Sequence, residues 1–242
     1  MTQYHLRIAA SADDLARQVA EQVAAQIDLA LAQRDRAQIA LAGGETPRAS
    51  YVRLGGVHLP WERVDVLLGD ERWVSANDPA SNAGMLRDTL LAQVPARNAA
   101  FHPVPTDEAN PEAGAEAYAR VLRDLGSGPL PCFDVILLGL GDDGHTASLF
   151  PGSAALTERK RSVCVSEGKG MPRITLTAPV LSAARQVIFL VSGAGKRQAL
   201  ERLLDPGEPS ERTPARLVQP LREVLILADA EAASGLPERV SA

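Results

Sequence analysis

The stretch Gly139-Leu-Gly-Asp-Asp-Gly-His145-Thr-Ala-Ser-Leu-Phe150 decides how this 242-residue chain folds. It follows the apolar run Phe133-Asp-Val-Ile-Leu-Leu138, which is typical of a buried β-strand, so the chain leaves a sheet into a turn that holds three glycines. Open α/β sheets bind their ligands at the carboxyl ends of their strands. Histidine is the side chain best suited to accept a proton near neutral pH, so we interpret His145 as the chemical centre of a small-molecule site.

The rest of the chain alternates between expected strands and expected helices. Ser11 caps a helix in which apolar residues recur every four positions from Leu15 to Leu31. The strands are continuous apolar runs, which favours a mainly parallel sheet with helices on both faces, in one α/β domain over residues 1–242. We expect further strands at 38–42, 64–68, 133–138, 161–166, 174–177, 186–191 and 223–227, and further helices after Pro47, at 81–93, at 111–125 and from about 195.

The composition is that of an ordinary globular protein, with 45% hydrophobic and 23% charged residues. A net charge of -5 disfavours a nucleic-acid partner, because such proteins carry a basic surface. The two cysteines, Cys132 and Cys164, lack CxxC spacing, which indicates reduced thiols and a cytoplasmic location. No signal peptide or apolar run of ~20 residues is visible, so we expect no membrane partner.

Four further loops carry residues that suit an anionic ligand. Gly43, Gly44 and Thr46 lie where a strand turns into a helix, so backbone N–H groups and a hydroxyl can approach an anion there. Asp70 and Arg72 follow the next strand; the guanidinium could bind a phosphate or carboxylate, and the carboxylate could accept from sugar hydroxyls. The sequence of each loop alone is ambiguous, because a plain tight turn or a surface ion pair would have the same pattern. Two more cations, Arg173 and Lys196, complete a possible cationic pocket.

Several other interpretations of these motifs are disfavoured. The glycines of 139–144 match the dinucleotide fingerprint, but Asp142 and Asp143 stand where a pyrophosphate needs free N–H donors. A metal site at Asp142, Asp143 and His145 lacks a second histidine or cysteine at ligand spacing, so no metal is expected. Ser148 lacks the glycine elbow of a nucleophilic serine. The 192–197 loop is not a phosphate-binding Walker loop, because Leu190 and Arg197 replace its glycine and its hydroxyl residue.

Taken together, the loops resemble those of the 6-phosphogluconolactonase family, in order and over about residues 38–230. The family's GHTASLFP segment is the most specific of its motifs. The matching pieces are Gly43–Pro47, Gly69–Arg72, Ser81-Asn82, Gly139–Pro151, Arg173–Thr175 and Ser192–Lys196. The resemblance implies a Rossmann-like doubly wound sheet and hydrolysis of 6-phospho-D-glucono-1,5-lactone without a metal or cofactor. The expected partner is this small phosphosugar lactone, and the protein is expected to be a monomer.

The resemblance also assigns expected roles. His145 would remove a proton from the attacking water, Asp143 would orient the imidazole or the turn, and amides of the turn from Gly141 to His145 would hold the oxyanion. The phosphate would bind the Gly44–Thr46 amides with Arg72, Arg173 and Lys196, while Asp70 and Asn82 would contact hydroxyls or brace the loops.

Two alternatives share this scaffold. Glucosamine-6-phosphate deaminases resemble the loop up to His145 but continue with a carboxylate where this chain has Phe150, which favours lactone hydrolysis here. Asp70 does not discriminate, since the deaminases have the matching acid. A non-catalytic sugar-phosphate sensor would be expected to lack His145 and to carry an extra binding module.

Overall fold

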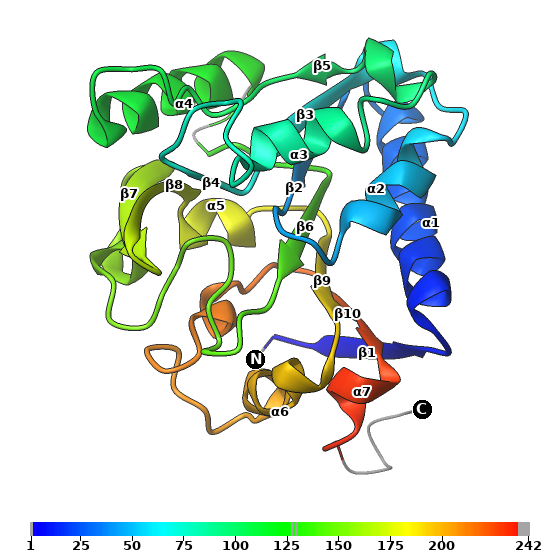
Figure 1. Ribbon diagram of the computed structural model, residues 1–242, viewed down its shortest axis with the longest axis vertical. Helices are drawn as coiled ribbons and strands as arrows, with labels where there is room; N and C mark the ends of the chain where they lie inside the picture. Colours follow the sequence, from blue (N-terminus) through cyan, green and yellow to red (C-terminus); the bar gives the residue numbers. More distant parts are fainter. Residues whose placement is uncertain (1, 127, 129, 237–242) are drawn as a thin grey trace.

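The computed structural model describes residues 2–126, 128 and 130–236, whose strands form two sheets (Figure 1). The larger sheet has seven strands within these residues, and every neighbouring pair is parallel. This confirms the mainly parallel α/β fold. The spatial order is β1 (Tyr4–Ala9), β10 (Val224–Asp229), β9 (Val187–Val191), β6 (Val135–Gly139), β2 (Ala37–Leu41), β3 (Val64–Leu68) and β5 (Ala100–Phe101).

The strand order reverses direction between β2 and β6. From β2 the chain adds β3 and β5 on one side, and from β6 it adds β9 and β10 on the other. Loops that leave the carboxyl ends of two such strands diverge, which opens a crevice at the sheet edge. The loops after β2 and β6 begin at Ala42 and Leu140, so the Gly43-Gly44 turn and the turn at 139–144 flank this crevice.

The second sheet is antiparallel, which differs from the expected arrangement of its strands. It consists of β4 (Asp70–Arg72), β8 (Met171–Leu176) and β7 (Val163–Gly168) in that order. Only Lys169 and Gly170 connect β7 to β8, and both have positive φ, at 53° and 80°. A two-residue turn of this kind joins antiparallel strands, whereas a parallel pair needs a crossover of a dozen residues or more.

The helices lie on both sides of the larger sheet. Figure 1 shows α1 and α2 on one side and α4, α5 and the small sheet on the other. Among the described residues, no helix is long and apolar enough to cross a membrane. The α-helices are α1 (Ala12–Leu31), α2 (Arg48–Gly55), α3 (Asn82–Asp88), α4 (Pro111–Leu125), α5 (Ala178–Ser182), α6 (Arg197–Leu204) and α7 (Ala230–Ala233). The 3-10 helices are η1 (Trp61–Arg63), η2 (Ala96–Asn98), η3 (Ala154–Thr157), η4 (Ala194–Lys196) and η5 (Pro214–Leu217).

Several elements depart from the sequence expectation, which did not include the short elements β4, β5, α5 and α7. Helix α3 ends at Asp88 rather than at 93, because Thr89 leaves the helical region and its hydroxyl donates back to the carbonyl oxygen of Met85 at 2.7 Å. Strand β1 was not predicted at all. It lies at the sheet edge and is half exposed, so its sequence shows no continuous apolar run.

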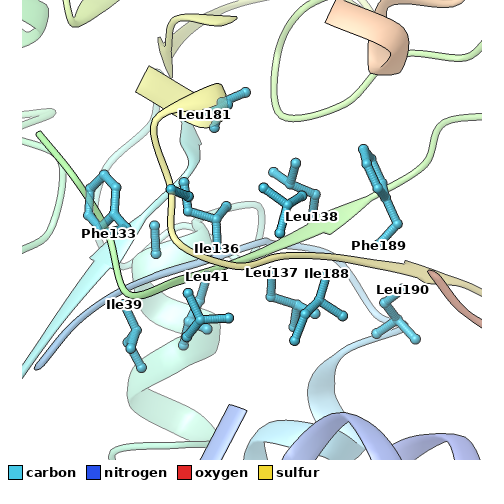
Figure 2. Close-up of a cluster of buried hydrophobic side chains, with 14 of the residues drawn as sticks. Ile39, Leu41, Phe133, Ile136, Leu137, Leu138, Leu181, Ile188, Phe189 and Leu190 are labelled. Carbon is cyan, nitrogen blue, oxygen red and sulfur yellow. The ribbon is translucent and has the colours of Figure 1, made fainter. Parts of the chain in front are cut away.

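The core occupies both faces of the larger sheet. In Figure 2, Ile136 and Leu138 of β6 point to one face and Leu137 points to the other, while neighbouring β9 repeats the alternation. All three side chains are buried, as are Ile188 and Phe189 of β9. Burial on both faces explains why these strands read as unbroken apolar runs. It also fixes the strand ends, and therefore the loops that follow them.

Candidate active site

One cavity lies at the carboxyl ends of the parallel strands, in the crevice where the strand order reverses. The loops after β2, β3, β6 and β9 all contribute to its lining. Every candidate site residue from the sequence lines it except Asp143, which lies behind His145. The lining candidates are Gly43, Gly44, Thr46, Asp70, Arg72, Asn82, Gly141, His145, Arg173 and Lys196.

His145 is held by a carboxylate of its own loop. Asp143 Oδ1 accepts from His145 Nδ1 at 2.5 Å and from the His145 backbone N–H at 3.0 Å. The turn is tight, since a Cβ on Gly141 would lie 2.0 Å from Nδ1 and Gly144 has a φ of 87°. With Nδ1 donating to the carboxylate, a neutral ring carries its lone pair at Nε2. The arrangement is that of a base and its orienting acid.

The electrostatics of this pair favour a neutral imidazole beside an ionised carboxylate. Burial lowers the pKa of His145 below its usual value, and the hydrogen bond and charge of Asp143 only partly oppose this. Burial acts to raise the pKa of Asp143, but the hydrogen bonds from His145 outweigh it and hold that pKa below its usual value. A neutral imidazole near pH 7 can accept a proton from water.

The turn uses its backbone donors internally, which contradicts the expectation that they hold an oxyanion. Gly141 N–H donates to the His145 carbonyl at 2.8 Å, and Gly144 N–H donates to the Gly141 carbonyl at 3.0 Å. The N–H groups of Asp143 and His145 donate to the carboxylates of Asp142 and Asp143, at 3.2 and 3.0 Å. Four of the five amides of this turn, those of Gly141, Asp143, Gly144 and His145, therefore already have acceptors.

Asp142 and Asp143 face different partners. Asp142 is exposed and forms an ion pair with Lys169, at 3.6 Å between Oδ1 and Nζ. The charge of Lys169 lowers the pKa of Asp142. Lys169 lines the cavity, and the sequence reasoning missed it. The signal was the Lys-Gly pair after a strand, which is compatible with a two-residue hairpin turn.

Phe150 connects the His145 loop to the small sheet. Its ring centroid lies 4.4 Å from that of His145, and the guanidinium carbon of Arg173 lies 5.3 Å from it on the ring face. A Cβ on Gly168 would lie 2.3 Å from the ring, so only glycine allows the hairpin to approach this closely. The hairpin tip is thereby fixed beside the imidazole.

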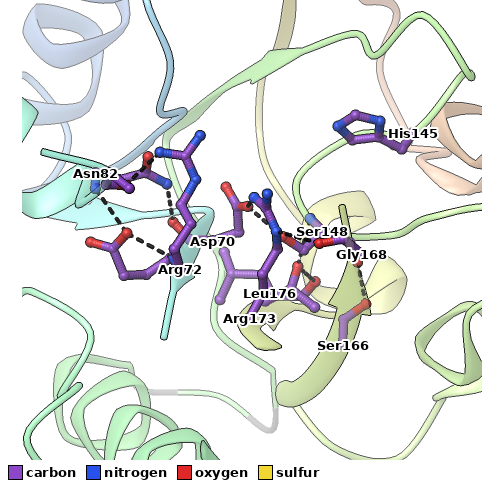
Figure 3. Close-up of polar contacts among 12 residues, drawn as sticks. Asp70, Arg72, Asn82, His145, Ser148, Ser166, Gly168, Arg173 and Leu176 are labelled. Carbon is purple, nitrogen blue, oxygen red and sulfur yellow. Dashed lines mark hydrogen bonds and ion pairs between the residues drawn. The ribbon is translucent and has the colours of Figure 1, made fainter. Parts of the chain in front are cut away.

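Asp70 lies at the centre of a buried polar group (Figure 3). Its Oδ2 accepts from the Ser148 hydroxyl at 2.5 Å and lies 3.8 Å from Arg173 Nη1. Ser148 is fully buried and its hydroxyl donates to a carboxylate, which agrees with its not being a nucleophile. Burial lowers the pKa of Arg173, and the Asp70 charge opposes this.

Glu71 organises the neighbouring loop without entering the cavity. This carboxylate is 1% exposed and accepts from the Ser81 hydroxyl and from the backbone N–H groups of Arg72, Asn82 and Ala83, all within 3.1 Å. Burial raises the pKa of Glu71, and these hydrogen bonds oppose it. No local pattern indicates that Glu71, the middle residue of the charged run Asp70–Arg72, is buried. By holding this loop, Glu71 positions its neighbours Asp70 and Arg72.

Arg72, Asn82 and the glycine loop meet at one wall of the cavity. Arg72 Nη1 donates to the Ala80 carbonyl at 2.6 Å, and Asn82 Nδ2 donates to the Asp70 carbonyl at 2.8 Å. A Cβ on Gly43 would lie 1.8 Å from Asn82 Oδ1, so the close approach requires glycine. Glu45 of the same loop is exposed and points toward Arg48, away from the cavity lining.

The Lys196 loop is fixed by an acid at the end of β10. Asp229 Oδ2 accepts from the Ser192 hydroxyl at 2.6 Å and from the Gly193 N–H at 2.9 Å. Gly193 has a φ of 93°, which turns the chain from β9 into η4, the short helix that ends at Lys196. The cavity therefore holds the cations Arg72, Lys169, Arg173 and Lys196 with the acid Asp70. In the described part of the chain, no three acidic, histidine or cysteine side chains cluster as metal ligands would.

Comparison with known proteins agrees with these motifs. The family described as glucosamine-6-phosphate isomerases/6-phosphogluconolactonase matches residues 10–227. A 6-phosphogluconolactonase of Synechocystis sp. is 45% identical over 217 residues, which cover 88% of this chain and 90% of that protein. The structure of 6-phosphogluconolactonase from Trypanosoma brucei has a TM-score of 0.87 at 32% identity and covers 98% of this chain and 100% of its own.

A solved structure of lower sequence identity shares the fold of this chain. A monomeric glucosamine-6-phosphate deaminase has a TM-score of 0.79 at 22% identity, and covers 97% of this chain and 100% of its own. At that identity the likeness shows a common fold only, so the distinction between the two activities depends on the site. From the matched residues and the relatives above, the chain belongs to the glucosamine-6-phosphate isomerase/6-phosphogluconolactonase family.

Proposed function

We propose that this protein is a 6-phosphogluconolactonase, which hydrolyses 6-phospho-D-glucono-1,5-lactone to 6-phospho-D-gluconate in the oxidative pentose phosphate pathway. The observation that carries the proposal is the 2.5 Å pair of His145 and Asp143, set in a cavity lined by four cations. The pair supplies a neutral base, and the cations suit a phosphorylated substrate. The names of the relatives at 45% and 32% identity support the same reaction.

In the proposed mechanism, His145 Nε2 removes a proton from a water as its oxygen attacks the lactone C1. The carbonyl becomes an oxyanion, and Asp143 stabilises the imidazolium that forms. When the tetrahedral intermediate collapses, the bond between C1 and the ring oxygen breaks. The imidazolium returns its proton to that oxygen, which becomes a hydroxyl, and C1 becomes a carboxylic acid that ionises. A lactone is already an activated ester, so this path requires no metal.

The phosphate is proposed to bind opposite His145, at the wall formed by the loop after β2. There Gly44 and Thr46 supply backbone and hydroxyl donors and Arg72 supplies charge, while Lys196 adds charge from the loop after β9. Arg173 adds charge from the floor of the cavity, partly balanced by Asp70. Lys196→Ala is expected to raise KM for the phosphorylated lactone about tenfold or more, and to change KM for glucono-1,5-lactone little. Equal losses with both substrates would contradict the phosphate assignment.

The direct test is acid release from freshly prepared 6-phosphogluconolactone, with chelator present. The wild-type protein should accelerate it, and His145→Ala should lower kcat by roughly 10²–10⁴ with KM largely unchanged. His58→Ala is the matched control, because His58 is exposed and lies outside the cavity. No acceleration by the wild-type protein would refute the lactonase proposal, and ammonia release from glucosamine 6-phosphate would then be measured. Near-native rates in His145→Ala would refute the base assignment alone.

A further inference from the structure

Lys169 is a cavity cation that the proposed mechanism has not used. It forms the tip of the turn between β7 and β8, and its side chain is 53% exposed. The turn lies beside the His145 loop, because Gly168 packs on the Phe150 ring and that ring packs on the imidazole. The ammonium pairs with Asp142, three residues before the base. Lys169 therefore belongs to the His145 side of the cavity.

Lactone hydrolysis creates negative charge on this side. The carbonyl oxygen becomes an oxyanion in the transition state, and the product carries a new carboxylate at C1. The His145 turn offers little to either, because the N–H groups of Gly141, Asp143, Gly144 and His145 already have acceptors. A positive charge beside the base would compensate for the missing donors.

We propose that the Lys169 ammonium binds the C1 end of the substrate, where it stabilises the oxyanion and the product carboxylate, and that Asp142 is the positioning residue that holds it there. This inference rests on the proposed lactonase activity. It divides the adjacent acids between two tasks, since Asp143 orients the imidazole and Asp142 orients the lysine. The Asp142–Lys169 pair is exposed and loose at 3.6 Å, so the ammonium can leave it for a substrate oxygen at small cost.

The charges around the imidazole agree with this placement. Lys169 acts to lower the pKa of His145 as well as that of Asp143, so its charge reaches both members of the pair. The charges of Asp143 and Asp70 also act on His145, and both raise its pKa. Removing the lysine charge should therefore raise the pKa of His145. A purely structural role for the hairpin tip would not produce that change.

The test compares Lys169→Met and Lys169→Arg with Lys160→Met, an exposed lysine outside the cavity. Because Lys169 is half exposed, Lys169→Met is expected to lower kcat about tenfold, less than the loss of a buried oxyanion donor. The loss should be similar with 6-phosphogluconolactone and with unphosphorylated glucono-1,5-lactone. Lys169→Arg should recover most of it, and Lys160→Met should behave as wild type.

Binding of two inhibitors separates the two ends of the cavity. Lys169→Met should weaken the binding of 6-phosphogluconate about fivefold or more. The affinity for glucitol 6-phosphate, which lacks the carboxylate, should stay within about twofold of the wild-type value. An equal loss of affinity for both compounds, or a kcat loss confined to the phosphorylated lactone, would make Lys169 a phosphate ligand and overturn the proposal. Unchanged kinetics and binding would also overturn it. The NMR titration of His145 needs no substrate, and an unraised pKa in Lys169→Met would refute the placement even if the wild-type protein hydrolysed no lactone.

Discussion

Replacing Asp143 with asparagine tests the contact that we propose makes His145 a base. Asp143 Oδ1 accepts from both the ring Nδ1 and the backbone N–H of His145. An asparagine side chain can keep its oxygen in this place, because the flipped amide would direct its NH₂ group at two donors. The variant should therefore retain the loop and the ring tautomer and lose mainly the negative charge.

The expected loss of rate follows from the strength of that charged hydrogen bond. A hydrogen bond to a charged group contributes about 1.5–3 kcal/mol, and the 40% exposure of the Asp143 side chain places this one near the lower limit. A loss of about 1.5–2 kcal/mol in the transition state lowers kcat roughly 10- to 30-fold. This is smaller than the loss expected for His145→Ala.

The pH profile gives the sign of the effect. The base must be neutral, so activity falls as the pH drops through the pKa of His145. In the wild-type protein burial lowers that pKa, and Asp143 partly opposes the lowering. Without the carboxylate the pKa falls further, while the charges of Lys169 and Asp70 remain. The acid limb of the profile should move to lower pH, with a lower plateau.

Initial rates of acid release, followed at constant pH from mildly acidic to neutral conditions, measure both quantities. An acid limb that stays in place or moves to higher pH would refute the electrostatic reasoning. A kcat loss as large as that of His145→Ala would show that the asparagine had turned and blocked the base. Native kcat would show that the short contact does not assist proton transfer.

Three further substitutions test contacts of the site loops and of the sheet. Gly43→Ala should lower kcat/KM with the fold intact by circular dichroism, because a Cβ would lie 1.8 Å from Asn82 Oδ1; native kinetics would contradict this contact. Asp229→Ala should raise KM for phosphorylated lactone more than it lowers kcat, because it frees the loop at 192–196; a kcat loss alone would be unexpected. Asp65→Asn should lower the free energy of unfolding by roughly 2–3 kcal/mol in urea titrations, because this 2% exposed carboxylate pairs with the Arg36 guanidinium and also lies 2.9 Å from His102 Nε2. Burial acts to raise the pKa of Asp65, but its partners lower that pKa overall. The free energy of unfolding of the wild-type protein should therefore also fall as the pH drops below the usual carboxyl range. A free energy of unfolding that does not change with pH in that range would contradict this.

The order of strands and helices could be predicted because burial and turns leave local signals. Strand β3 occupies the predicted 64–68, and helix α4 occupies the predicted 111–125. The unbroken apolar runs reflect a sheet covered on both faces. Strand β1 lacked that signal because it is a half-exposed edge, and the antiparallel pairing of β7 with β8 depended on a single Lys-Gly turn.

The residues that line the cavity could be predicted from several loops, but a contact between two of them could be predicted only where one loop contains both partners. Asp143 and His145 are two residues apart, so their contact follows from the turn itself. Lys169 reaches the same loop through a hairpin and the contact of Gly168 with Phe150, which a linear sequence does not reveal. The burial of Glu71 could not be predicted, because it depends on the later Ser81–Ala83 segment. Tertiary contacts of this kind leave no local pattern.

Phe150 connects fold, electrostatics and the choice between the two activities of the family. Its ring lies 4.4 Å from the imidazole and contributes to the burial that lowers the pKa of His145. The resemblance implies that deaminases place a carboxylate at this position. A negative charge so close would favour the protonated imidazole, which is an acid rather than a base. An apolar ring instead keeps His145 neutral, leaves Asp143 as its hydrogen-bonded carboxylate, and allows the hairpin that carries Lys169 to approach the site. We therefore expect the residue at this position to set the protonation state of the shared histidine.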